Sequence, residues 1–388
     1  MDNPFKLDTS AFPKELVLLL HWLSSDPAQA SGRPPEPPWN MYDPELFLEL
    51  ARFHRVYPFL YAQLKDSEAP SAILQLLKTE YMINTFQMLH LTRALDQLFR
   101  LLKDNGIPAL LLKGPALAKD LYGDTSLRTC KDLDILIPPD EFDPTDRLLQ
   151  SSGFMPDDAS PRIYNWKKTL HHCSYTNQTT GIQVEIHWKL QPGSWPEPTF
   201  DELWSRRQEC FHQDNPVYRP GNEDLLLYLA VHGARHSWFR LRWLLDIRQL
   251  LKKDLDWRLI TGLMKQQNSH IAVGQALILC NQLLGTLPHP AMQRLLSSSA
   301  SQSAAQTAAL YIAQMEKPDA YALKFTRYLL SLLKMRQKLS YLKSFYYPSS
   351  QDALTLPLPS LLHFLYFPIR PLLLLWRRLK YKTRVREL

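Results

Sequence analysis

Cysteine is scarce in this chain of 388 residues. The four cysteines are Cys130, Cys173, Cys210 and Cys280. None of them belongs to a CxxC pair, so neither a zinc site nor a disulfide framework is indicated. A chain of this length with 45% hydrophobic residues can bury a sizeable core without such cross-links. We therefore expect a folded protein of the reducing cytoplasm.

The chain also lacks an apolar run long enough to cross a bilayer. Its most apolar segment, residues 361–375, is interrupted by Pro368, Arg370 and Pro371, whereas a spanning helix needs about 20 consecutive apolar residues. Asp2 precedes the first lysine, and no cleavage site of small residues follows a basic start. The sequence therefore predicts neither a transmembrane helix nor a signal peptide.

The chain has no net positive charge outside its C-terminal part. From Lys324 onward there are 13 Lys and Arg residues and 2 acids, a net charge of +11, which leaves −4 for the rest of a chain whose total is +7. A body that is not basic argues against a sequence-specific nucleic-acid protein. The basic tail predicts contact with phosphates, acidic partners or a membrane surface, or a charged end that is simply solvated.

Two carboxylates placed two residues apart are the most informative feature of the sequence. Asp132 and Asp134 alternate with Leu133, Ile135 and Ile137 in a predicted strand, so both carboxylates project from one face. Carboxylates held this close repel each other. Mg²⁺ relieves the repulsion and binds one or two protein carboxylates together with substrate phosphates. The pair therefore predicts a metal site and phosphate chemistry.

A glycine turn precedes this pair. Residues 109–112 form a short apolar strand, Lys113 and Gly114 form its exit, and Pro115 begins a helix. Glycine allows close approach of backbone amides to a ligand, and a helix N-terminus favours an anion. We expect Lys113 and Gly114 to contact phosphate, although Lys113 read alone is equally a surface charge.

Arg128 lies between this turn and the carboxylate pair. An arginine at this point can neutralise a triphosphate, or it can form a structural ion pair with Asp120 or Asp124. The sequence leaves both roles open.

A later strand supplies a third carboxylate. Residues 182–188 alternate in polarity, which places Glu185 and His187 on one face, and the turn at residues 178–181 joins them to a strand at 172–176 as a hairpin. Glu185 is either a metal ligand or a solvated strand residue. We interpret His187 as a hydrogen-bonded strand histidine rather than a ligand.

The following segment is helical and carries His232 and His236 four residues apart, on one helix face. No glutamate lies between them, so the zinc-protease pattern HExxH is absent. We expect Arg235 or His236 at the lip of a nucleotide cleft. Further along, Trp238, Trp243 and Asp246 are expected to be packing and helix-capping residues.

These parts together resemble the core of nucleotidyltransferases of the DNA polymerase beta superfamily. The blocks "KG…L…Y…R…D-hydrophobic-D", "acid-hydrophobic-His-Trp" and "H…H-x-W…R-W…D" are similar to one bacterial branch, the uncharacterised nucleotidyltransferase-like proteins. The matching blocks span about residues 105–250. Two positions depart from the commonest pattern: Gly114 is followed by Pro115 instead of Ser or Gly, and Glu185 stands where Asp is more usual.

The resemblance implies an α+β fold in which a small mixed sheet is flanked by helical regions at both ends. We predict an N-terminal helical region at residues 1–104 and the nucleotidyltransferase domain at 105–192. A helical domain follows at 193–345, and an apolar and basic segment at 346–388.

The resemblance also implies a reaction and its site. A magnesium-dependent enzyme would move a nucleoside monophosphate from a nucleoside triphosphate such as ATP to an acceptor hydroxyl, and would release pyrophosphate. Asp132, Asp134 and Glu185 would be catalytic and would hold two Mg²⁺ ions. The predicted nucleotide-binding residues are Lys113, Gly114, Arg128, Arg235 and His236.

Three alternatives remain open. One is a catalytically degenerate protein that binds a nucleotide or a partner, which the Gly114 and Pro115 turn favours. Another is an enzyme that adds AMP to a hydroxyl of a protein. The last is a peripheral membrane or polysaccharide-assembly factor, for which the tail after Leu361 would contact the inner membrane surface.

Overall fold

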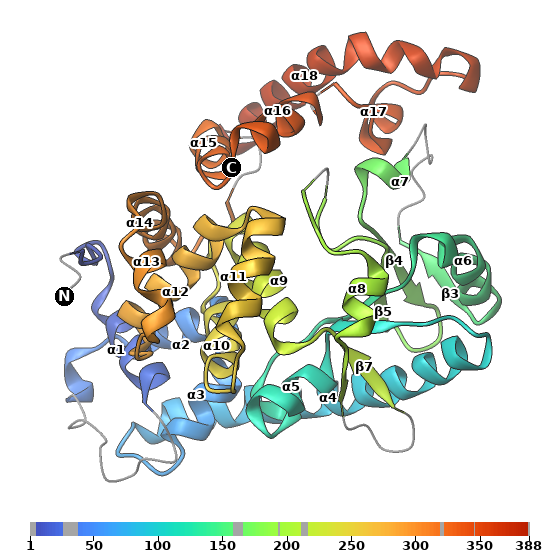
Figure 1. Cartoon of the computed structure of the whole chain (residues 1–388). Helices are drawn as coiled ribbons and strands as arrows, with labels where there is room; N and C mark the ends of the chain where they lie inside the picture. Colours follow the sequence, from blue (N-terminus) through green and yellow to red (C-terminus); the bar gives the residue numbers. More distant parts are fainter. Residues whose placement is uncertain are drawn as a thin grey trace.

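The computed structural model describes residues 5–25, 38–157, 166–192, 195–210, 216–318, 322–344 and 346–386. Helices precede and follow a small mixed β-sheet (Figure 1). The predicted α+β class is therefore confirmed.

The described residues before the sheet, 5–25 and 38–104, are largely helical. The helices are α1 (Lys14–Ser24), α2 (Pro44–Phe53), α3 (Tyr57–Leu64) and α4 (Ser71–Asp104). Asp43 caps α2 because its side chain accepts hydrogen bonds from the first free backbone N–H groups of the helix. Helix α4 ends at Asp104 with Asn105 as its C-cap, and Gly106 then adopts φ +72°, a left-handed conformation that glycine accepts readily.

The central sheet has five strands in the order β1-β2-β5-β4-β3. Its strands are β1 (Leu110–Lys113), β2 (Asp132–Leu136), β3 (Phe154–Pro156), β4 (His172–Asn177) and β5 (Gln183–His187). Strands β2 and β5 are parallel, and the other neighbours are antiparallel. The β4–β5 hairpin forms at the predicted turn, where Gly181 adopts φ +68°.

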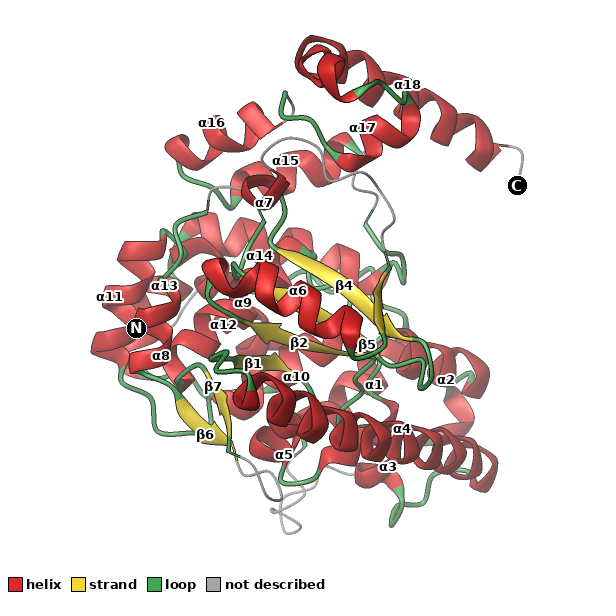
Figure 2. Cartoon of the chain, turned by 90° about the vertical axis from the view of Figure 1, so that its right-hand side faces the viewer, coloured by secondary structure: helices red, strands yellow, loops and turns green. Residues whose placement is uncertain are grey.

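The two faces of this sheet contact different apolar cores. Leu133 and Ile135 pack with the C-terminal half of α4 and with α6 (Phe142–Ser151). Leu110, Leu112 and Leu136 point the other way, into the core of the helical part of the molecule. Figure 2 shows the strands with α4 and α6 on the near side and the later helices behind them. The polar residues of β2 and β5 are therefore presented towards the helical part.

The later helices share a core with the first ones. They are α8 (Phe200–Ser205), α9 (Asn222–Arg235), α10 (Leu241–Leu250), α11 (Trp257–Gln267), α12 (His270–Leu284), α13 (Gln293–Leu296) and α14 (Ser299–Ala313). Leu16 and Leu50 from the N-terminal helices belong to the same buried cluster as Leu229 of α9 and Leu277 of α12. A small hairpin, β6 (Gln208–Cys210) with β7 (Val217–Arg219), lies beside them. The first three predicted regions thus contribute to common cores, whereas the buried residues of the fourth, Ala353, Tyr366 and Leu373, form a small cluster of their own. The boundaries of the four regions stay a prediction.

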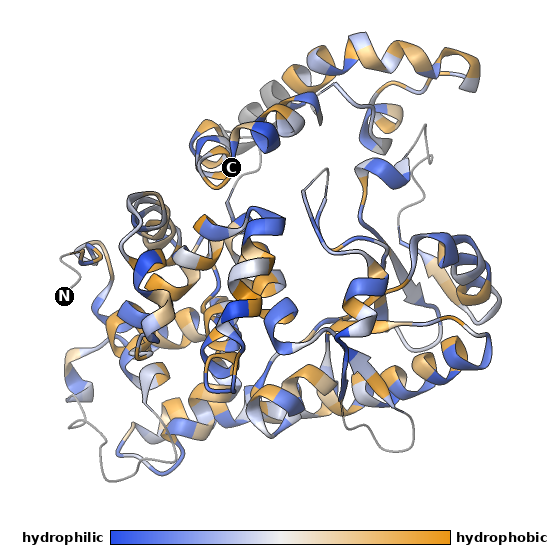
Figure 3. Ribbon diagram, viewed as in Figure 1, coloured by the Kyte–Doolittle hydropathy of each residue, from blue (hydrophilic) through white to orange (hydrophobic). Residues whose placement is uncertain are grey.

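The C-terminal part forms an arm at one end of the molecule, at the top of Figure 1. It consists of α15 (Leu323–Ser331), α16 (Met335–Ser344), α17 (Ser350–Thr355) and α18 (Tyr366–Arg386), with Pro371 inside α18. Figure 3 shows hydrophobic stretches along α18, and Leu372 and Trp376 are at least half exposed. Within the described ranges, no helix combines the length and the apolarity needed to cross a membrane.

Candidate active site

The register of three strands brings the predicted carboxylates together. In the parallel pair β2 and β5, Asp134 lies directly opposite Glu185, and Asp132 lies opposite Gln183. On the other side of β2, a bulge in β1 places Lys113 opposite Asp134. Side chains two residues apart in a strand share a face. Asp132, Asp134 and Glu185 therefore project from the face that turns towards α9.

His187 contacts two of these carboxylates. Its Nε2 donates a hydrogen bond to Oδ1 of Asp134 at 3.2 Å and lies 3.3 Å from Oε2 of Glu185. Burial alone would lower the pKa of His187, but the hydrogen bonds to both carboxylates outweigh it and raise the pKa. The predicted role of His187 as a hydrogen-bonded strand histidine agrees with this geometry.

The surroundings shift the pKa values of the two carboxylates on β2 in opposite directions. Burial and the neighbouring charges of Asp134 and Glu185 raise the pKa of Asp132 to about 6. Burial would also raise the pKa of Asp134, but Lys113 and the hydrogen bond from His187 outweigh it, so that pKa is lowered. Hard oxygen donors with a residual negative charge suit Mg²⁺. Ligand atoms of Asp134, Glu185 and His187 lie within 4.8 Å of one another, so these residues could hold a divalent cation, and Asp132 lies on the same face of β2.

The turn after β1 needs glycine. Gly114 adopts φ +151°, and a Cβ added there would lie 3.2 Å from Cδ1 of Leu111. Pro115 then begins α5 (Pro115–Tyr122), as predicted. Lys113 is only 7% exposed, its Nζ lies 3.2 Å from Nε2 of His232, and burial lowers its pKa. Lys113 therefore connects the sheet to α9 through its contact with His232.

The sequence of the chain decides the family. A family model described as "Uncharacterised nucleotidyltransferase" matches residues 40–285, more than half of the 388 residues. The chain belongs to this nucleotidyltransferase family. The match includes every strand of the sheet and all the predicted site residues. No curated protein sequence matches the chain significantly.

Two solved structures are similar to this nucleotidyltransferase family member. The solution structure of the antibiotic-resistance factor ANT(2'')-Ia aligns at 11% identity and a TM-score of 0.35, covering 49% of this chain and 95% of its own. The crystal structure of an antigenic nucleotidyltransferase-like protein from Paracoccidioides brasiliensis aligns at 14% identity and a TM-score of 0.32, covering 53% and 97%. The family assignment rests on the sequence match.

Arg128 lies away from the carboxylates and forms an ion pair inside the molecule. Its Nε and Nη2 donate to Oδ1 and Oδ2 of Asp246 on α10, at 2.9 and 3.0 Å. The two side chains are 1% and 0% exposed. The expected partners were Asp120 and Asp124, but Asp120 pairs with other basic residues and Asp124 caps the following turn. Asp246, expected to pack or cap a helix, is thus an ion-pair partner.

The remaining predicted residues lie on α9 and at its end. Arg235 donates from Nη1 to Oε1 of Gln191 at 2.6 Å, just beyond β5, so it faces the end of the carboxylate strand. His236 packs against the ring of Trp243 with ring centroids 5.3 Å apart, and burial lowers its pKa to about 3. Arg235 is thus better placed than His236 to contact a ligand at the sheet.

Two histidines beside the carboxylates were missed. His172 pairs with His187 across the hairpin, its Nε2 lies 3.7 Å from Oε2 of Glu185, and His171 precedes it. Burial and the other histidines lower the pKa values of His171 and His172. The predicted turn at residues 178–181 contained the signal, because a hairpin closed there places His172 opposite His187.

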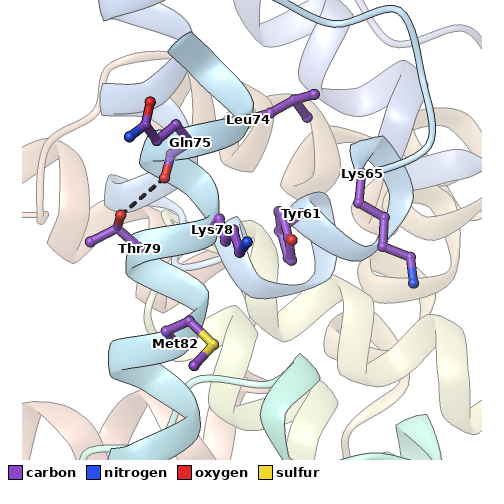
Figure 4. Close-up of a pocket in the computed structure, with 7 residues that line it drawn as sticks. All are labelled: Tyr61, Lys65, Leu74, Gln75, Lys78, Thr79 and Met82. Atoms are coloured by element: carbon purple, nitrogen blue, oxygen red, sulfur yellow. Dashed lines mark hydrogen bonds between the residues drawn. The ribbon is translucent and has the colours of Figure 1, made fainter. Parts of the chain in front are cut away.

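A cavity of about 580 Å³ lies elsewhere, between α3 and α4 (Figure 4). Its seven lining residues are Tyr61, Lys65, Leu74, Gln75, Lys78, Thr79 and Met82. None of them is acidic, and none belongs to the sheet. This cavity is therefore separate from the carboxylate site.

Proposed function

We propose that the protein transfers a nucleoside monophosphate from a nucleoside triphosphate to an acceptor hydroxyl, with Mg²⁺ bound by Asp132, Asp134 and Glu185. The observation that carries this proposal is the pairing of Asp134 with Glu185 in adjacent parallel strands, with Asp132 on the same face. Membership of a nucleotidyltransferase family supports it. Buried carboxylates are otherwise costly, and a bound cation offsets that cost.

In the reaction, the acceptor oxygen forms a bond to the α-phosphorus and loses its proton to water. The bond from the α-phosphorus to the bridging oxygen breaks, and its electron pair leaves with pyrophosphate. When bound, Mg²⁺ supplies a lower pKa for the acceptor hydroxyl and neutralises charge on the leaving pyrophosphate. The carboxylates contribute by holding the positive charge of the metal ion in position before the reaction begins.

His187 contributes to the same positioning. Its hydrogen bond to Asp134 and its contact with Glu185 hold both carboxylates on one face. Because its Nε2 contacts both carboxylates, the ring fixes their orientation. Residues that contact metal ligands without binding the metal themselves commonly have this role.

The turn at Gly114 supports a phosphate contact. Gly114 and the N-terminus of α5 leave backbone N–H groups free of helical partners, although Pro115 contributes none. Arg235 supplies a positive charge near the end of β5. Arg128 does not fit a nucleotide contact as well, because its Nε and Nη2 are already bound to Asp246.

The test is pyrophosphate release from each of the four nucleoside triphosphates in the presence of a panel of hydroxyl acceptors. We expect Asp134→Asn to abolish release and Asp140→Asn, at an exposed position four residues past β2, to leave it unchanged. Far-UV circular dichroism checks that both variants fold. Full turnover by Asp134→Asn would reject the metal assignment.

Three further measurements separate the alternatives. Binding of a nucleotide without any pyrophosphate release would identify a degenerate, non-catalytic protein. Transfer of label from an α-labelled nucleotide to a protein band would identify a protein-modifying enzyme. Binding to anionic vesicles that is lost on removing residues after Pro357 would support the membrane alternative.

A further inference from the structure

Three histidine rings gather at the edge of the carboxylate site. His171, His172 and His187, here called the histidine cluster, each offer one ring nitrogen, and these nitrogens lie within 4.8 Å of one another. The ring centroids are 4.4 Å apart for His171 and His172, and 4.8 Å apart for His172 and His187. None of the proposed nucleotide chemistry uses His171 or His172.

The closest pair already has the spacing of metal ligands. Nε2 of His171 and Nδ1 of His172 are 3.2 Å apart. A tetrahedral zinc ion with Zn–N bonds of about 2.0–2.1 Å separates its ligand nitrogens by about 3.3 Å. The third nitrogen lies close to such an ion, because His172 and His187 are opposite each other on two paired strands and His171 directly precedes β4.

The backbone fixes the cluster. His172 and His187 are register partners in the β4–β5 hairpin. The carbonyl of His171 accepts hydrogen bonds from the backbone N–H of Trp188, at 3.0 Å, and of Lys189, at 3.4 Å. Strand pairing therefore holds His172 and His187, and the hydrogen bonds to its carbonyl hold His171 beside them. A site on strands is positioned more precisely than one on a loop.

The unused nitrogens have the arrangement expected around a metal. Nε2 of His187 bonds to Asp134, while its Nδ1 is buried and has no hydrogen-bond partner among the described residues. Nδ1 of His172 faces His171, and its Nε2 faces Glu185. A histidine ligand commonly donates its second ring N–H to a carboxylate, which orients the ring. Both His172 and His187 have a carboxylate in that position.

We propose that His171, His172 and His187 form a nitrogen-donor site for one transition-metal cation of the zinc class, adjacent to the carboxylate site. Imidazole nitrogen favours Zn²⁺, Co²⁺ or Ni²⁺ over Mg²⁺, which prefers oxygen ligands. His171 and His172 are only partly buried, so an ion can reach them from solvent. The proposal stands on the geometry of the cluster and does not require nucleotidyl transfer.

The test uses Co²⁺ as the probe on the full chain after removal of metals with a chelator. Four-coordinate Co²⁺ with nitrogen ligands absorbs strongly in the visible range, whereas Co²⁺ bound to six oxygens absorbs weakly. We expect one equivalent of strongly absorbing Co²⁺, displaced by Zn²⁺ and not by Mg²⁺. His171→Gln and His172→Gln should each weaken its binding at least tenfold, and His90→Gln, at an exposed position on α4, should not.

Asp132→Asn separates this proposal from the proposed function. It should abolish Mg²⁺-dependent nucleotide chemistry and leave the strong cobalt absorption intact. Absorption that disappears in Asp132→Asn but persists in both histidine variants would overturn the histidine site, as would a wild-type protein that develops no such absorption. X-ray absorption of the wild-type cobalt complex gives a second readout that needs no variant: three imidazole ligands support the proposal, and an all-oxygen shell refutes it.

Discussion

The buried ion pair between Arg128 and Asp246 predicts a large loss of stability when its charge balance is broken. It joins the segment before β2 to helix α10, and Tyr122 of α5 donates a further hydrogen bond to Oδ1 of Asp246 at 2.8 Å. Both charged side chains are almost completely buried. Asp246→Asn keeps the shape of the side chain but leaves the guanidinium of Arg128 without a counter-charge.

Removing one partner of such a pair costs about 3–5 kcal/mol of unfolding free energy, because an unpaired charge stays buried. We expect Asp246→Asn to fall in that range. Tyr122→Phe removes one hydrogen bond to a charged acceptor and should cost about 1.5–3 kcal/mol. The double variant Arg128→Met with Asp246→Leu should lose much less than the sum of its single changes, since it buries no charge.

The assay is urea unfolding followed by tryptophan fluorescence. The control is Glu80→Gln, which breaks an ion pair with Arg52 of similar length, 3.0 Å, on side chains that are 29% and 48% exposed. Such exposed pairs contribute about 0–1 kcal/mol. A loss below about 1 kcal/mol for Asp246→Asn, or strictly additive effects in the double variant, would refute the reasoning.

Three further predictions concern single positions. A Cβ at Gly233 would overlap the buried ring of Trp238, so Gly233→Ala should cost about 1–3 kcal/mol; unchanged urea unfolding would refute this packing. Gly114→Ala should lower stability by about 1–3 kcal/mol because of its φ of +151°, and a neutral result in the same assay would mean that the turn tolerates a side chain. Burial raises the pKa of Glu197 from 4.5 to about 7, although two backbone N–H groups oppose the shift. The folded state then binds more protons than the unfolded state between these values, so this group makes stability fall as the pH rises from 4.5 to about 7. Glu197→Gln should remove that slope, and parallel stability curves for variant and wild type would contradict the shift.

The sequence predicted β1, β2, β4 and β5 because their signals are local, but it did not predict the three-residue strands β3, β6 and β7. Alternation around Asp134 and around Glu185 fixed which side chains share a face, and the turn at residues 178–181 fixed the hairpin. That the strand of Glu185 would neighbour the strand of Asp134 was expected from the family resemblance and not from local signals, since it depends on the order of the whole sheet.

The partner of Arg128 could not be predicted for the same reason. Asp246 lies 118 positions away in the chain, and only the packing of α10 against α5 brings it into contact. Nearby acids such as Asp120 were better candidates by sequence distance alone. The burial of Lys113 against His232 depends likewise on how α9 covers the sheet.

The most direct test of the nucleotide site is a thermal-shift titration with ATP, GTP, CTP and UTP, with and without Mg²⁺. A ligand that binds only the folded state at 100 times its Kd stabilises the protein by about 2.7 kcal/mol. We predict a Mg²⁺-dependent shift with at least one nucleotide for the wild type and none for the double variant Asp132→Asn, Asp134→Asn. A wild type that no nucleotide stabilises, or a double variant that is stabilised equally, would contradict the account.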